Sequence, residues 1–160
     1  MSTQQYITRL TSLKEGELTL LRSLSGKGLD ETVLGFDLFT GVWWPLRAQS
    51  AQAPRREVAW LVAKLFASYP IPNAVEGAEI SRLLSRIEPE ELKAKRRYRA
   101  RFDKMLTLPL AAIEPSLAWA LATISASKAH LNWARLTDDL SIWERDSTRA
   151  KWAEQYVENL

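Results

Sequence analysis

A run of basic residues past the middle of the chain offers the clearest chemistry in this sequence. The segment 91–106, ELKAKRRYRARFDKML, holds seven Lys and Arg side chains and one internal acid, Asp103. Positive charge clustered on one rigid element can bind the phosphates of nucleic acid. The run also lacks the Glu–Lys alternation that stabilises an ordinary exposed helix. A phosphate-binding surface is therefore one interpretation. The other is a charged face that only meets solvent, which is what most charge runs are.

Residue spacing predicts that this segment is an amphipathic helix. Each residue advances about 100° around a helix, so apolar side chains at suitable spacing share one face. The predicted buried face holds Tyr98, Phe102, Met105 and Leu106. Three cations repeat along one flank of that face, and we call them the ridge: Arg97, Arg101 and Lys104. Lys95 and Arg99 fall on the opposite flank, and Arg96 points away from the core.

The other apolar segments also have helical spacing, and no sustained alternation typical of strands occurs. We therefore predict an all-α fold, a helical bundle of eight to nine helices in two packed halves. The most apolar segment, 55–69, should lie centrally, because apolar residues surround most of its circumference. Arg55 and Arg56 stand at its start, where the helix dipole disfavours cations, and are candidate binding residues for that reason.

Proline and glycine suggest where the chain divides. A joint is expected at Pro70–Ala78, PIPNAVEGA, between a front helical half, 1–69, and a rear helical half, 79–160. Within the front half, the third helix is expected to close at Trp43–Pro45, with a loop running on to Pro54. The length of 160 residues suits a single all-α protein.

Composition excludes most catalytic chemistry. The chain has no cysteine and one histidine, His130, so thiolate chemistry and zinc sites are not expected. No nucleophile triad, HExxH or GxGxxG motif occurs. We expect no enzyme activity, no cofactor and no metal. The polar start and the lack of a long apolar run predict no signal peptide, no membrane span and a cytoplasmic location.

Several motifs follow one another in an order that resembles a known family. They are LTLLR at Leu18–Arg22, PRREVAWLVAKLFASY at 54–69, RARFDKML at Arg99–Leu106, the W-x-x-L-x-x-D-L-x-x-W pattern at Trp133–Trp143 and RAKWAEQY at Arg149–Tyr156. In this order and in a chain of this length, they resemble the CasB family, the small helical subunit of the type I-E CRISPR Cascade complex. The resemblance covers nearly the whole chain.

The resemblance implies an all-helical, non-catalytic protein that works in pairs beside other Cascade subunits. It implies contacts with the crRNA and target DNA, and help in holding the displaced strand. By position, Arg55 matches the basic residue at the start of the central helix, and Arg99 and Arg101 match the paired basic positions. Some relatives carry arginines in the helix 116–127, where this chain has Trp119 and Ala120, so Lys128 is the nearest substitute there.

Residue pattern and resemblance together predict a sequence-independent binder of nucleic-acid backbone. The candidate binding residues are Arg55, Arg56, Arg97, Arg99, Arg101, Lys104 and Lys128. The alternative from another class is a helical scaffold whose basic ridge docks an acidic protein. A helix-turn-helix regulator is a third possibility, which would prefer one duplex sequence. Affinity that falls steeply with salt for every base sequence would favour the first interpretation.

Overall fold

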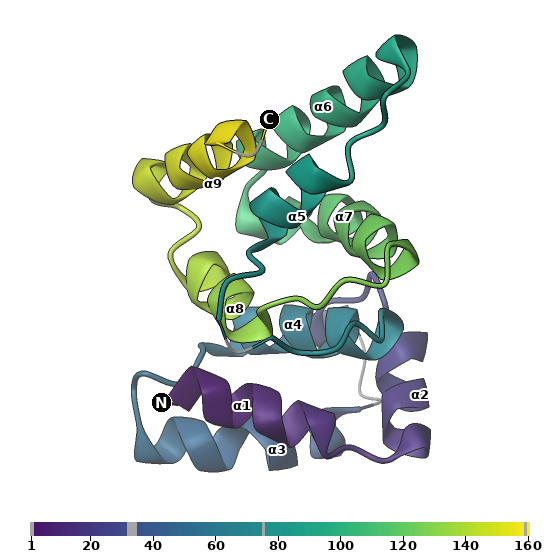
Figure 1. The fold of residues 1–160 in the computed structure, drawn as a ribbon. Helices are drawn as coiled ribbons and strands as arrows, with labels where there is room; N and C mark the ends of the chain where they lie inside the picture. Colours follow the sequence, from purple (N-terminus) through teal and green to yellow (C-terminus); the bar gives the residue numbers. More distant parts are fainter. Residues whose placement is uncertain (1, 32–34, 75, 159) are drawn as a thin grey trace. The chain divides into compact units, whose positions relative to one another are not determined.

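The computed structural model describes residues 2–31, 35–74, 76–158 and 160. These residues form nine α-helices, two short 3₁₀-helices and no strand, which confirms the all-α prediction (Figure 1). The one extended pairing among them is an isolated bridge between Asn73 and Leu131. None of the described helices is both long enough and apolar enough to cross a membrane.

The described helices group into two compact units. Unit 1 comprises residues 1–70 and 133–141, and unit 2 comprises residues 71–132 and 142–160. Helix α8 therefore groups with helices from the front of the sequence, although it follows the joint by more than fifty residues.

Unit 1 is built around one apolar helix. Its elements are α1 (Ser2–Thr11), α2 (Glu15–Ser23), η1 (Leu29–Glu31), α3 (Phe36–Gln49), α4 (Arg56–Ser68) and α8 (Trp133–Ser141). Every residue of α4 from Val58 to Leu65 is buried, and α4 packs against α2, α3 and α8. This confirms that the most apolar segment is central in its unit. Lys64 is the one cation in that run, and its ammonium donates to the carbonyl of Lys27 at 2.7 Å.

The third helix ends later in the chain than predicted, so that prediction is wrong. Helix α3 continues through Pro45 to Gln49 instead of closing at Trp43–Pro45. Proline removes one helical hydrogen bond, which usually ends or kinks a helix. Two features of the next turn stabilise the continuation: Leu46 is buried, and Arg47 donates to the carbonyls of Ala51 and Ala53 at 2.9 and 2.7 Å.

Unit 2 holds the basic helix. Its elements are α5 (Ile80–Arg86), α6 (Leu92–Thr107), η2 (Leu110–Ala112), α7 (Glu114–Ala126) and α9 (Asp146–Glu158). Helices α5 and α6 each pack against both α7 and α9. Trp143 and Trp152 are fully buried, with ring centroids 4.8 Å apart, and the indole of Trp143 donates to the carbonyl of Leu108 at 2.8 Å. These tryptophans serve the core.

A buried hydroxyl provides a test of packing in unit 1. Tyr6 is fully buried, and its hydroxyl donates to the carbonyl of Ala59 in α4 at 2.6 Å. Tyr6→Phe should lower the free energy of unfolding by about 1 kcal/mol, because the hydrogen bond is lost inside the core. Chemical denaturation followed by circular dichroism measures this.

Tyr69→Phe is the matched control, since the half-buried Tyr69 makes no side-chain hydrogen bond to any described residue. It should change the unfolding free energy by less than about 0.5 kcal/mol. Equal values for the two variants would contradict the role of the Tyr6 hydroxyl.

Candidate nucleic-acid interface

Helix α6 has a well-defined start and end, which fixes the direction of its side chains. Glu91 caps the N-terminus, where its carboxylate accepts from the backbone N–H groups of Lys93 at 3.1 Å and Ala94 at 2.7 Å. A carboxylate here also interacts favourably with the helix dipole. The helix ends at Thr107, two residues before Pro109, which cannot continue it.

The predicted buried face of α6 is confirmed. Tyr98, Phe102 and Met105 are at most 7% exposed, and Leu106 is half-buried. The Tyr98 hydroxyl donates to the carbonyl of Leu84 in α5, and the Phe102 ring lies 4.5 Å from that of Tyr156 in α9. Because this face is fixed against α5 and α9, the rotation of α6 is fixed, and its two flanks differ in chemistry.

One flank of α6 is neutralised by a carboxylate from the turn before it. Glu88 has a side chain only 8% exposed and accepts two hydrogen bonds from the Arg99 guanidinium, at 2.7 and 2.9 Å. Lys95 approaches the same carboxylate at 3.9 Å, and the Tyr156 hydroxyl donates to it. The Arg99 hydrogen bonds, aided by Tyr156, lower the pKa of Glu88, while burial and Glu88 raise the pKa of Tyr156. The Arg99 side chain is thus half-exposed, and its guanidinium is already bonded to Glu88.

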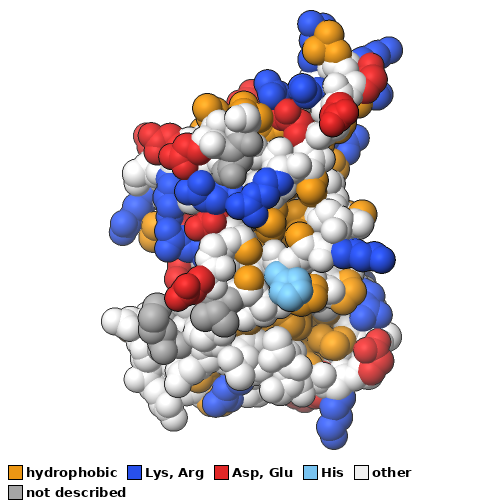
Figure 2. Space-filling view, in the orientation of Figure 1, with side chains coloured by type: hydrophobic (Ala, Val, Ile, Leu, Met, Phe, Trp, Pro, Cys, Tyr) orange, Lys and Arg blue, Asp and Glu red, His pale blue; other side chains and the backbone are white. Residues whose placement is uncertain are grey.

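The ridge on the other flank has no such partner. Arg97, Arg101 and Lys104 are all exposed, and none forms an ion pair with any described residue. The structure therefore brings these three predicted residues together as uncompensated positive charge on one helix. Figure 2 shows Lys and Arg side chains around the N-terminal end of α6 at the upper right, and a second group over α9 at the left.

An aromatic side chain from α7 lies beside the ridge. Trp119 is half-buried, and its ring meets the Tyr98 ring edge-on with centroids 5.3 Å apart. The Arg101 guanidinium lies over the Trp119 ring at 5.8 Å from its centroid, within the range of a cation–π contact. The sequence marks Trp119 only as a position in a helix where some relatives carry arginine. Nothing in the spacing of α6 could indicate that this residue of α7 meets the ridge.

Two shallow hollows lie on either side of this contact. One, of about 200 Å³, is lined by Arg97 and by Pro89, Ala94 and Tyr98. The other, of about 220 Å³, is lined by Lys104, Pro115 and Ser116. Arg101 and Trp119 line both. Each hollow therefore combines a ridge cation with an aromatic wall.

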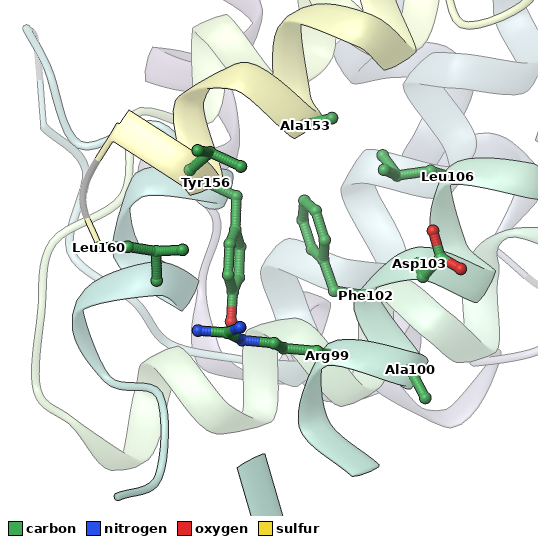
Figure 3. A pocket seen from close by; sticks show the side chains of 9 residues that line it. Arg99, Ala100, Phe102, Asp103, Leu106, Ala153, Tyr156 and Leu160 are labelled. Carbon is green, nitrogen blue, oxygen red and sulfur yellow. The ribbon is translucent and has the colours of Figure 1, made fainter. Parts of the chain in front are cut away.

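A larger hollow of about 410 Å³ lies between α6 and α9 and has different chemistry (Figure 3). Phe102, Tyr156 and Leu160 give it a mainly apolar lining, and its one cation, Arg99, runs below the Tyr156 hydroxyl. Since Arg99 is paired with Glu88 and Asp103 adds negative charge, this hollow is less suited to phosphate than the ridge.

The remaining predicted residues lie elsewhere. Arg55 precedes α4 in unit 1, where it donates to the carbonyl of Ser141 at 2.7 Å and pairs with Glu57 at 3.3 Å. Arg56 is exposed in the first turn of α4. Lys128 in unit 2 is exposed just past the C-terminal end of α7, and its left-handed φ of 60° ends that helix. No group of three or more metal-binding side chains occurs among the described residues.

Comparison with protein families identifies the relatives of this chain. The model of the CRISPR-associated protein Cse2 family matches residues 17–156. The chain belongs to the Cse2/CasB family. This confirms the resemblance that the ordered motifs indicated, and with it the assignment to a CRISPR-associated protein of type I-E Cascade.

Crystal structures of CasB proteins have the same fold. CasB from M. ruber superimposes with a TM-score of 0.78 at 17% identity, covering 99% of this chain and 94% of that one. CasB from Thermus thermophilus gives 0.74 at 20% identity, covering 99% of both chains. CasB from Thermobifida fusca gives 0.66 at 17% identity, covering 95% of this chain and 90% of that one. No curated protein sequence matches the chain significantly.

The Glu88 cluster gives a prediction about pH. Because the folded-state pKa of Glu88 is lowered, its contribution to stability is present above the unfolded-state pKa of about 4.3 and is lost as pH falls through the folded value. Glu88→Gln should therefore lower the unfolding free energy at pH 7 by about 1 kcal/mol. Below pH 5, the unfolding free energy of the variant should decrease less with falling pH than that of the parent. Urea denaturation between pH 3 and 7 measures both effects.

Glu90→Gln is the control, since Glu90 is exposed and its side chain forms no hydrogen bond or ion pair with the described residues. The unfolding free energy of Glu90→Gln should depend on pH as that of the parent does. If the unfolding free energy of Glu88→Gln also runs parallel to that of the parent at every pH, the Glu88 carboxylate does not stabilise the fold as described.

Proposed function

We propose that this Cse2/CasB-family protein is a non-catalytic Cascade subunit that binds nucleic-acid backbone through the ridge, whatever the base sequence. In the complex it would stabilise the pairing of crRNA with target DNA and the displaced strand. The observation that carries the proposal is the uncompensated charge of Arg97, Arg101 and Lys104 on one flank of a fixed helix. Family membership supports the setting.

The spacing of the ridge suits a strand that follows the helix. Arg97 and Arg101 are separated by about 6 Å along the axis, and Arg101 and Lys104 by about 4.5 Å. A strand running along α6 would therefore bring successive phosphates near successive cations. Phosphate contacts position a nucleic acid but do not read its sequence, and no side-chain pattern here indicates base recognition.

The other candidate residues have more limited roles in this proposal. Arg99 can offer phosphate only the donors that Glu88 leaves free, so we expect a smaller contribution from it than from the ridge. Arg55 is similarly engaged with Ser141 and Glu57, while Arg56 and Lys128 are exposed. Contacts of these four with crRNA or target DNA stay predictions, as does pairing with a second copy in Cascade.

Salt dependence tests the ridge. Arg97→Gln, Arg101→Gln and Lys104→Gln should each weaken binding to every sequence alike and reduce the slope of log affinity against log salt by about one unit. Binding through one phosphate contact fewer releases about one counterion fewer, and this accounts for the change of about one unit in the slope. Fluorescence anisotropy with labelled oligonucleotides over a salt series measures the slopes.

Arg96→Gln is the matched control, because Arg96 is an exposed cation of α6 off the ridge, without an ion pair among the described residues. It removes the same charge and should change the slope less. Parent-like slopes in all three ridge variants would defeat the proposal. Binding that an acidic protein competes away, but nucleic acid does not, would favour the scaffold alternative.

Assembly tests the cellular setting. When the chain is co-expressed with the other type I-E Cascade subunits and a crRNA, it should copurify with the ribonucleoprotein. Combined Gln substitution of the three ridge residues should weaken target-DNA retention by the complex, since backbone contacts are lost. A complex that forms without this chain and holds target DNA equally well would contradict the assignment.

A further inference from the structure

The tryptophan beside the ridge differs from the buried tryptophans of the cores: Trp119 is partly exposed, as Trp43 and Trp44 of unit 1 also are. Trp133, Trp143 and Trp152 are fully buried and serve the cores, but Trp119 is only half-buried and lines two hollows. Backbone binding by cations does not require an aromatic ring at the surface. The combination of a ring with three uncompensated cations therefore points to a ligand that has flat groups as well as phosphates.

Single-stranded nucleic acid has this chemistry. Sites for single strands combine a basic track for the backbone with aromatic side chains on which bases stack. A duplex keeps its bases stacked inside and must flip one out, at a cost of a few kcal/mol, before the base can reach a protein ring. A partly exposed aromatic ring beside a phosphate track therefore favours unpaired bases over a duplex.

We propose that Trp119 is a stacking platform for an unpaired base and that the ridge site takes single-stranded nucleic acid. The inference rests on the proposed function and specifies its ligand. An unpaired base enters one of the hollows against Trp119, while the flanking phosphates of the same strand meet Arg97 and Lys104, each of which lines one hollow. Arg101 lies over the ring now, and its guanidinium can move aside or stack on the base with its charge still near the backbone.

The experiment compares three ligands of equal length on the full chain: oligo(dT), an abasic strand with the same phosphates, and a duplex. The parent should bind oligo(dT) about 5- to 150-fold more tightly than the abasic strand, which is the range for one stacked base. Trp119→Leu should remove most of that difference and leave the abasic and duplex affinities unchanged. Its salt slope should equal that of the parent, because no phosphate contact is lost.

Two variants serve as controls. Trp119→Phe keeps an aromatic face and should retain most of the preference for oligo(dT). Trp44→Leu removes a tryptophan of unit 1 that is 54% exposed and belongs to α3, and it should bind all three ligands like the parent. Circular dichroism and denaturation midpoints check that each variant is folded.

Three results would overturn the inference. The parent could bind oligo(dT) and the abasic strand equally, a comparison that needs no variant to fold. Trp119→Leu could bind oligo(dT) like the parent. Trp119→Leu could also lower the affinity for all three ligands by the same factor, in which case Trp119 only positions Arg101. In each case the ridge Gln variants would still lower the salt slope if the proposed function holds, so the two failures are distinguishable.

Discussion

The ion pair between Glu88 and Arg99 is the interaction on which the arrangement of the basic helix depends. Glu88 belongs to the short link between α5 and α6, Arg99 to α6 and Tyr156 to α9, so one carboxylate connects three parts of unit 2. A carboxylate this poorly exposed is costly unless its oxygens are bonded, and here the guanidinium and the phenol bond them. The cluster therefore favours one rotation of α6 about its axis. That rotation turns Tyr98 and Phe102 inward and leaves the ridge on the opposite flank.

The same cluster separates the cations of α6 into two kinds. Lys95 and Arg99 share the charge of Glu88, whereas Arg97, Arg101 and Lys104 form no ion pair with any residue in the described part of the chain. The net charge of +3 conceals this difference, because it averages over paired and unpaired groups. A protein with a nearly balanced composition can thus present a strongly basic strip. Affinity for an anion depends on the local field of such a strip more than on total charge.

Much of this could be predicted from the sequence, and the exceptions share a physical cause. Helical periodicity alone identified the buried face of α6 and the exposure of the ridge, because both follow from the geometry of one helix. It could not reveal that Glu88 neutralises Arg99 or that Trp119 meets Arg101, because both contacts join different elements. The end of α3 was mispredicted for a similar reason: Leu46 and Arg47 find partners outside their own turn, which outweigh the local effect of Pro45.

The placement of α8 in unit 1 affects how the chain folds as it is synthesised. The Thr3 hydroxyl donates to Asp138 at 2.8 Å, and Phe66 packs against Trp133, so helices α1 and α4 find some of their partners only after residues 133–138 have been synthesised. Until residue 141 has left the ribosome, α4 lacks one of its neighbours and exposes apolar surface. Neither unit corresponds to one continuous stretch of chain, so a truncation at the Pro70–Ala78 joint would leave a front fragment missing part of its own core.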